Sequence, residues 1–229
     1  KPVWEGDEWL RVAPVLQGLM AESAPLSLDT RRASVMRQAL GMGPVLINDV
    51  SALTYEEESL SVAASSDVPV LLMHAQGDPR TMQNDPSYAH CLLDVYDYLA
   101  ERLVAVQAAG IAPERVILDP GLGFGKRVVE DNLALMRGIA LFHTLGCPLL
   151  VGASRKRFVG ALSGEEDARQ RLGGSLAAAL EAVRMGVQLV RVHDVRETAQ
   201  ALRFLQATLD SSLADFAPLQ DAFERAAAV

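Results

Sequence analysis

The residues of this sequence that could do chemistry stand at the ends of six short apolar runs. In chain order these ends read Asp29-Thr30, Asn48-Asp49-Val50, Met73-His74, Asp119-Pro120, Gly152-Ala-Ser-Arg-Lys156 and Arg191-Val-His-Asp194. A single polar residue after an apolar run is ordinarily a helix cap or a turn former. Six such ends in one chain are more than structural needs demand. Together they predict one rim that binds a small molecule with N–H donors and anionic oxygens.

A glycine-rich segment, Gly121-Leu-Gly-Phe-Gly-Lys126, follows the run that ends in Asp119. It is not a dinucleotide fingerprint, because its third glycine comes one residue early. It is not a P-loop either, because three residues separate its outer glycines and Arg127 follows the lysine. The segment predicts a turn through which Phe124 and backbone groups approach a ligand closely, with a plain flexible turn as the alternative.

Several other kinds of chemistry are not supported by the sequence. No His or Cys pair has zinc-ligand spacing, and Ser154 has no partners at the spacing of a hydrolase triad. The net charge of −8 argues against binding to nucleic acid or to anionic membranes, and no apolar run is long enough to span a membrane. With Cys91 and Cys147 as its only cysteines, the chain is expected in the reducing cytoplasm.

The strands that must position this rim are predicted at residues 25–29, 45–49, 68–74, 115–119, 148–152 and 188–193. They are continuously apolar rather than alternating, which is typical of parallel strands buried on both faces. Between them Asp85-Pro86 predicts the start of a helix with an apolar stripe from Leu92 to Val106 and an end at Gly110. Three further helices are predicted from the same spacing, over the segments 9–20, 176–186 and 202–209.

Strands alternating with helices indicate a parallel sheet, either open and doubly wound or closed into a (β/α)₈ barrel. Because the polar strand ends gather on one rim, and because a helix precedes the first strand, a barrel is favoured. Its first two strands are expected to be absent from this sequence. The barrel domain is predicted over residues 1–209, and a helical tail over residues 210–229.

Three segments closely resemble signatures of the dihydropteroate synthase family: residues 118–126, 152–156 and 191–194. The resemblance extends through residues 27–30, 48–50, 73–83 and 171–175, in the family's order, and covers about residues 5 to 209. It implies a pterin-binding TIM barrel. It also implies an enzyme that joins 6-hydroxymethyl-7,8-dihydropterin pyrophosphate to p-aminobenzoate, with release of pyrophosphate, in folate synthesis.

The resemblance also implies roles for individual residues. Asp29, Asp119 and Lys156 are expected to be catalytic. The expected substrate-binding residues are Asn48, Val50, Met73, Phe124, Gly152, Arg157, Arg191 and His193. Asp119, Asn48 and Lys156 would hold the pterin edge, while Arg191 and His193 would favour the departing pyrophosphate. Mg²⁺ is the implied cofactor, with none of its ligands in this sequence, and a cytoplasmic homodimer is the implied assembly.

The sequence departs from the family pattern in two respects. Two family elements would precede its first residue. One is a strand and loop with a Mg²⁺-binding Asn, and the other is a second strand and loop that binds pyrophosphate and p-aminobenzoate. Arg157 stands where the family commonly has a Ser near the p-aminobenzoate carboxylate. A pterin-binding methyltransferase barrel and a non-catalytic pterin-binding barrel are the alternative functions.

Overall fold

The computed structural model describes residues 4–22, 24–77, 81–82 and 84–210, in which parallel strands alternate with helices. The strands of this part are β1 (Ser27–Asp29), β2 (Leu46–Asp49), β3 (Val70–Met73), β4 (Val116–Asp119), β5 (Leu150–Val151) and β6 (Leu189–Val190). Its α-helices are α1 (Glu5–Leu19), α2 (Ala33–Met42), α3 (Glu57–Ala64), α4 (Cys91–Ala108), α5 (Glu130–Arg137), α6 (Arg157–Ser163), α7 (Leu172–Arg184) and α8 (Val195–Leu209). Short 3₁₀ segments are η1 (Pro113–Arg115), η2 (Ile139–Leu145) and η3 (Ala168–Gln170).

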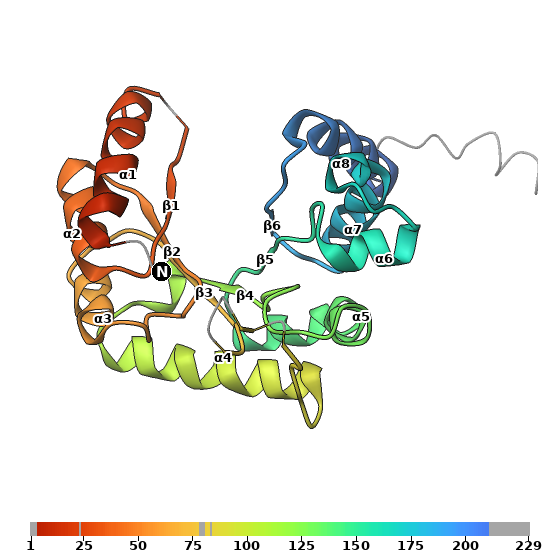
Figure 1. Ribbon diagram of the computed structural model, residues 1–229, viewed down its shortest axis with the longest axis horizontal. Coiled ribbons are helices and arrows are strands. Elements are labelled where there is room, and N and C mark those ends of the chain that lie inside the picture. The colour runs from red at the N-terminus through yellow and green to blue at the C-terminus, as the bar shows by residue number, and fades with distance from the viewer. Residues whose placement is uncertain (1–3, 23, 78–80, 83, 211–229) are drawn as a thin grey trace, which may run out of the picture.

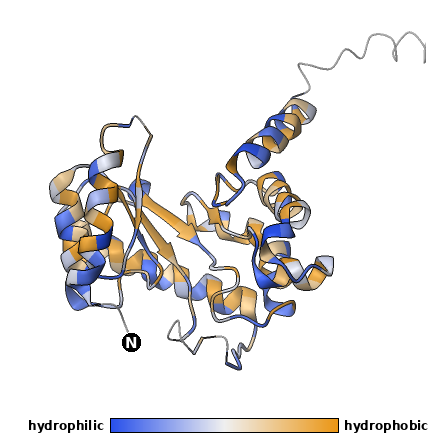
Figure 2. Cartoon of the chain, turned by 45° about the horizontal axis from the view of Figure 1, so that its top comes forward, coloured by the Kyte–Doolittle hydropathy of each residue, from blue (hydrophilic) through white to orange (hydrophobic). Residues whose placement is uncertain are grey.

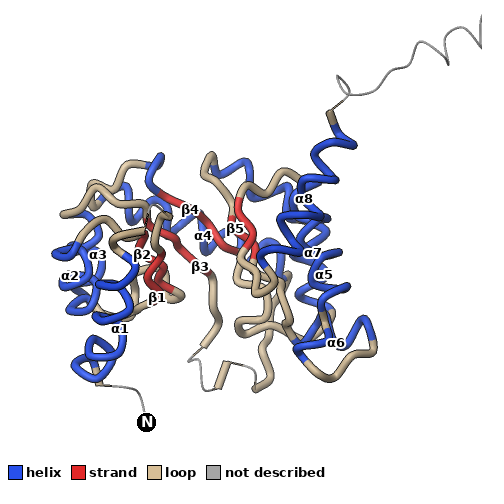
Figure 3. Tube along the Cα trace, turned by 90° about the horizontal axis from the view of Figure 1, so that it is seen from above, coloured by secondary structure: helices blue, strands red, loops and turns tan. Residues whose placement is uncertain are grey.

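The strands pair in parallel and in chain order. β1 to β4 form one ladder and β5 pairs with β6, while a parallel bridge between Leu118 and Leu149 joins the two ladders. Figure 1 shows this sheet on the inner side of the molecule and the helices on its outer side. Figure 3, seen from above, shows the strands in the middle with helices flanking them on both sides. All the strands therefore end on one side of the sheet, as the predicted parallel architecture requires.

The main core lies between the sheet and its helices, where apolar strand residues meet the buried stripes of the helices. In α4 the stripe consists of Val95, Leu99, Leu103 and Val106, at the spacing expected of one helix face. Figure 2 shows the strands almost entirely apolar, because helices cover their outer face. A smaller cluster, which includes Leu16, packs α1 against β1 and α2.

The structure corrects the predicted start of α4. Asp85 has a φ of +55°, which is not the extended conformation of an N-cap residue, and Asp85-Pro86 lies in the loop before the helix. The helix begins at Cys91, where the ring of His90 accepts a hydrogen bond from the N–H of Leu93. The predicted strands are confirmed in position but are shorter, because regular pairing covers only part of each apolar run.

Both cysteines, Cys91 and Cys147, are buried and unpaired. Burial raises the pKa of the Cys91 thiol to about 11. Among the described residues no helix is both long and apolar enough to cross a membrane. Apart from Asp210, the predicted C-terminal tail lies outside the described residues.

Candidate functional site

A chain of contacts connects the predicted site residues at the carboxyl ends of the strands. Asp29 pairs in register with Asn48 on the next strand, and Met73 pairs with Asp119. The guanidinium of Arg191 donates to Asp29 Oδ2 at 3.2 Å, so the last strand reaches the first. Both of these side chains are about half exposed. Such a pair contributes little to stability and is easily exchanged for contacts with a ligand.

Asp119 is a buried carboxylate of this rim, with 7% of its surface exposed. Its Oδ1 accepts the backbone N–H of Gly121 at 2.7 Å, whereas its Oδ2 accepts no hydrogen bond from a described residue. Burial raises the pKa of Asp119, and the positive charge of Lys156 opposes this rise. Because no buried side-chain oxygen of the described residues lacks a partner, Oδ2 reaches the surface of the rim, where it can accept N–H donors from a ligand.

Asn48 is also buried, with 4% of its surface exposed, at the end of β2. Its side-chain amide makes no hydrogen bond within the described part of the chain. Because no buried side-chain polar atom of the described residues lacks a partner, the amide atoms of Asn48 reach the surface of the rim, where a ligand can bond to them. Asn48 and Asp119 therefore offer a donor and acceptors from two strands that flank β3.

Lys156 extends from the loop after β5 over the glycine-rich segment. Its Nζ lies 4.5 Å from the centre of the Phe124 ring and donates to the backbone carbonyl of Leu122. Burial lowers the pKa of Lys156 to about 8, and the negative charge of Asp119 opposes this fall. An ideal Cβ on Gly152 would lie 3.9 Å from Lys156 Nζ and 3.7 Å from Arg191 Cβ. Gly152 thus lies in contact range of both Lys156 and Arg191, at distances of ordinary van der Waals contact.

The glycine-rich segment, residues 121–126, lies directly against the backbone that follows β3. A Cβ on Gly121, whose φ is +69°, would lie 1.9 Å from His74 O, and a Cβ on Gly125 would lie 2.4 Å from Gln76 O. No residue with a side chain fits at either position without moving the backbone. The close approach predicted from the glycines is therefore to the protein's own chain, and it places Phe124 and Asp119 at the rim.

Lys126 is buried behind this segment, and its role was not foreseen from the sequence. Its Nζ donates to Phe124 O at 2.9 Å and lies 3.0 Å from His74 Nδ1. Burial lowers the pKa of Lys126 to about 7. Burial, and then the charge of Lys126, lower the pKa of His74 to about 3. His74 is therefore a neutral acceptor that anchors Lys126. In the sequence, the one signal for this role is the position of the lysine directly after Gly125.

The loops after β5 and β6 are joined by groups that the sequence did not connect. Ser154 Oγ lies 3.0 Å from His193 Nδ1, and Arg155 makes a two-pronged ion pair with Asp194, at 2.5 and 3.1 Å. Arg155 has a φ of +59°. The ion pair fixes the loop that carries Lys156.

Asp49, counted in the predicted rim, serves the turn after β2 instead. Its Oδ1 accepts from the N–H and hydroxyl of Ser51, at 2.7 and 2.6 Å, and its Oδ2 accepts from the N–H of Leu53 at 3.2 Å. Ala52 and Leu53 both have positive φ, so this carboxylate stabilises a strained turn. Val50 follows it, half-buried, and lines a hollow together with Asp29.

Arg157 is the first residue of α6 and is exposed. It lines a cavity of about 360 Å³ together with Phe124, Lys156 and the side chains of Arg155 and Arg171. Arg155 is neutralised by its ion pair, whereas Arg157 makes no hydrogen bond or ion pair with a described residue. Arg157 is thus placed to meet an anionic group beside Lys156.

A metal site is not formed by the described residues themselves. No group of three or more His, Cys, Asp or Glu side chains among them is arranged to hold a metal ion. The rim therefore supplies cations and single carboxylates rather than a protein cage for a metal.

Comparison with known proteins identifies the family. The model of the pterin-binding enzymes matches residues 1–193. The dihydropteroate synthase of Neisseria meningitidis serogroup B is 48% identical over 205 residues, which are 88% of this chain and 72% of the relative.

Solved structures agree. The synthase of Xanthomonas albilineans in complex with 7,8-dihydropteroate superimposes with a TM-score of 0.85, at 41% identity, over 91% of this chain and 76% of that one. The synthase of Thermus thermophilus in complex with 4-aminobenzoate superimposes with a TM-score of 0.85, at 43% identity, over 90% of this chain and 79% of that one. These likenesses confirm the predicted barrel fold and favour the synthase over the two alternative functions. The chain belongs to the dihydropteroate synthases of the pterin-binding enzyme family.

Proposed function

We propose that the rim described above forms dihydropteroate from 6-hydroxymethyl-7,8-dihydropterin pyrophosphate and p-aminobenzoate, with the residue roles given below. The observation that carries these roles is the pair Asp119 and Asn48. Both are buried at strand ends, and both hold polar atoms that no described residue satisfies. The pyrimidine edge of a pterin presents adjacent N–H donors and a ring acceptor that match a carboxylate and an amide.

The remaining residues surround that edge. Met73 is buried beneath Gly121, and Phe124 lies under the ammonium of Lys156, so both can contact the flat pterin ring. Lys156, which contacts the glycine-rich segment that follows Asp119, donates to the ring edge. Arg191 can stack on the ring face, since a guanidinium is planar and weakly hydrated.

The reaction proceeds by cleavage of the bond between the pterin methylene carbon and the pyrophosphate oxygen. The electron pair leaves with pyrophosphate, and a cation remains on the pterin side. The carboxylates of Asp29 and Asp119 stabilise this cation electrostatically. The amine of p-aminobenzoate then forms the new N–C bond and releases a proton to solvent. Arg191 and His193 favour the departing anion.

Arg157 is the residue we assign to the carboxylate of p-aminobenzoate. It lies beside Lys156, lines the same cavity, and has no partner among the described residues. A guanidinium can bind a carboxylate through two parallel hydrogen bonds.

Mg²⁺ is proposed to arrive with the substrate. Mg²⁺ usually keeps several waters and binds through substrate phosphates with one or two carboxylates, so it does not require the protein cage that the described residues lack. When bound, it would neutralise charge on the pyrophosphate. Pyrophosphate release should therefore fall when Mg²⁺ is chelated and return when it is restored.

The decisive experiment measures pyrophosphate release by the full chain with both substrates and Mg²⁺. We expect release that depends on p-aminobenzoate and that is lost when Lys156 is replaced by Ala. Near-normal formation of dihydropteroate by the Lys156→Ala variant would remove this residue from the site. Tight pterin binding without release in the wild-type chain would favour a non-catalytic pterin-binding barrel instead.

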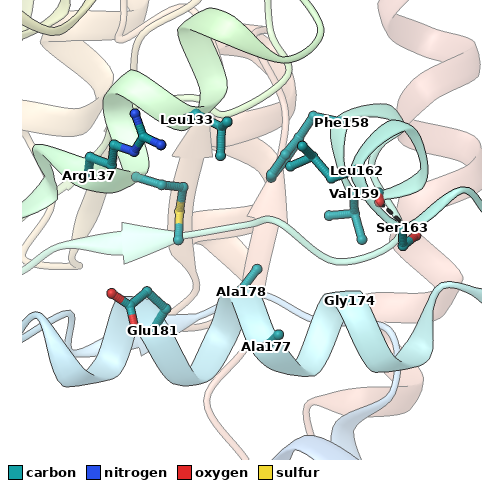
Figure 4. A pocket seen from close by; sticks show the side chains of 11 residues that line it. Leu133, Arg137, Phe158, Val159, Leu162, Ser163, Gly174, Ala177, Ala178 and Glu181 are labelled. Atoms are coloured by element: carbon teal, nitrogen blue, oxygen red, sulfur yellow. Dashed lines mark hydrogen bonds between the residues drawn. The ribbon is translucent and has the colours of Figure 1, made fainter.

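A homodimer is proposed as the assembly, with a groove between α5, α6 and α7 as the contact surface. The groove has a volume of about 350 Å³, and Leu133, Phe158, Val159 and Leu162 contribute to its largely apolar lining. Figure 4 shows these side chains facing Ala178 and Gly174 of α7, with Arg137 and Glu181 at one end. A second copy of the chain would cover this apolar surface.

A cytoplasmic location is proposed from the two cysteines, which are both unpaired and buried. Free thiols are typical of proteins that work in a reducing compartment. Cell fractionation with an antibody against the chain tests this location.

A further inference from the structure

The loops after β5 and β6 are fixed to each other by more than one contact. Ser154 Oγ accepts the backbone N–H of His193 at 3.2 Å and lies 3.0 Å from Nδ1 of the same residue. The ion pair between Arg155 and Asp194 joins the next residue of each loop. The backbone N–H of Arg155 also donates to Ser175 Oγ at 2.9 Å. The geometry between Ser154 and His193 is therefore held from several sides.

Counting donors and acceptors decides which ring nitrogen of His193 carries the proton. A serine hydroxyl has one proton to donate and two lone pairs. One lone pair of Ser154 Oγ already accepts the backbone N–H of His193. If Nδ1 carried the ring proton, it would take the second lone pair. The hydroxyl proton of Ser154, a residue only 6% exposed, would then have no acceptor among the described residues.

The opposite arrangement satisfies both Ser154 Oγ and Nδ1 of His193. Ser154 donates its hydroxyl proton to Nδ1, and the ring proton of the neutral imidazole then sits on Nε2. Nε2 makes no hydrogen bond with a described residue, and His193 is exposed on the same rim as Arg191. A neutral imidazole attracts an anion only through the nitrogen that bears hydrogen, because the other nitrogen presents a lone pair.

We propose that Ser154 is a positioning residue that holds His193 in the tautomer with its proton on Nε2, so that an N–H donor faces the departing pyrophosphate. The identity of this anion rests on the proposed function, but the tautomer does not. Ser154 acts only through His193 and needs no contact with the substrate.

The tautomer can be measured directly in the wild-type protein. Long-range ¹H–¹⁵N spectra of the full chain, labelled with ¹⁵N-histidine, would be followed to the alkaline plateau of the titration. The His193 signals are assigned from their loss in His193→Gln. We expect the shift of an unprotonated nitrogen for Nδ1 and of a protonated one for Nε2. The proton on Nδ1 would overturn the proposal.

Variants of Ser154 test its role. In Ser154→Ala we expect a mixture of both tautomers and a fall in kcat of about tenfold, the effect of one hydrogen bond. The Kd of a pterin without pyrophosphate should stay within about twofold, because the pterin edge is bound elsewhere. Ser154→Thr, which keeps the hydroxyl, should restore both tautomer and kcat. An Ala variant with unchanged tautomer and unchanged kcat would refute the role.

The control is Ser61→Ala, which removes an exposed hydroxyl that bonds to Glu58 O at 2.9 Å on α3, away from the rim. It should change neither the His193 spectrum nor kcat. If Ser154→Ala does not fold, the wild-type and Thr spectra still decide the tautomer. If the wild-type chain releases no pyrophosphate, the proposed function fails while the spectrum still answers for Ser154.

Discussion

Asp49 and Asp119 both end buried strands, yet their carboxylates are used differently. Both oxygens of Asp49 accept hydrogen bonds from the turn that follows it, whereas Asp119 keeps Oδ2 uncommitted within the described part of the chain. Burial raises the pKa of each carboxyl. Asp119 is therefore the carboxylate that still has an oxygen to accept hydrogen bonds from a ligand.

Replacing Asp119 with Asn should lower pterin affinity at least ~100-fold, since about 1.5–3 kcal/mol is lost with each charge-assisted hydrogen bond. A pKa raised by folding means that the stability linked to this group is present at low pH and lost as pH rises through the folded pKa. At pH 7 the Asn variant should therefore be no less heat-stable than the wild type. Calorimetric titration and thermal denaturation test both statements, and unchanged affinity would exclude Asp119 from the site.

At the scale of elements, the glycine-rich segment and the backbone after β3 form one packed unit. Gly121 and Gly125 allow the two backbones to touch, and Lys126 connects them through Phe124 O and the ring of His74. Tyr88 adds a hydrogen bond to Gly125 O at 2.5 Å. The position of Phe124 at the rim thus depends on contacts behind the segment.

Gly121→Ala should lower the free energy of unfolding by about 3 kcal/mol or more, because its Cβ would overlap His74 O. The matched control is Gly146→Ala. Gly146 has a similar φ of +75°, but nothing lies within 4 Å of its added Cβ. It should cost only the backbone strain, about 1–2 kcal/mol. Urea denaturation of both variants separates overlap from strain, and equal losses would contradict the close approach.

Lys126→Met should reveal the lowered pKa of the buried amine. Between about pH 7 and 10.5, unfolded wild-type chains hold the Lys126 proton while folded ones have lost it. The stability of the wild type relative to the Met variant should therefore rise across this range. Urea unfolding at several pH values measures the trend, and a difference that does not depend on pH would contradict it.

At the scale of the whole molecule, positive charge is concentrated at the strand ends although the chain is acidic. The chain carries a net charge of −8, yet Lys156, Arg157 and Arg191 gather at the strand ends. Anionic substrates are thus attracted to one rim of an otherwise acidic molecule. Apolar side chains are also exposed on the helices, among them Leu162 of α6 and Phe204 of α8.

Leu162→Glu should weaken the proposed dimer by roughly 100-fold, because an unpaired charge would be buried at the contact, at a cost of about 3 kcal/mol. The control is Val104→Glu, which places the same charge at a similarly exposed apolar position on α4. Light scattering across a dilution series should show dissociation of the first variant alone. A monomeric wild type would remove the dimer proposal.

The strand order could be predicted from the sequence because strands alternate with helices along the chain. Most rim positions could be predicted because a buried strand followed by a polar residue is a local pattern. The uses of Asp49, Lys126 and Ser154 could not be predicted in this way. Lys126 and Ser154 bond to His74 and His193, which are far away in the chain. Asp49 bonds to its own turn because of the direction in which its side chain points. The predicted start of α4 at Asp85 is wrong for a related reason. Asp85 takes a left-handed conformation, which cannot be predicted from its residue type alone.

Labelling of the two buried cysteines can report when the core of the molecule unfolds. Only a thiolate reacts quickly with maleimides, and burial raises the pKa of Cys91 to about 11. Cys147, which is also buried, likewise has a raised pKa. The folded chain should thus label slowly at both sites, and the labelling rate should follow unfolding as urea increases. Mass spectrometry of partly labelled samples would then show whether the parts of the core around Cys91 and Cys147 open together or in sequence.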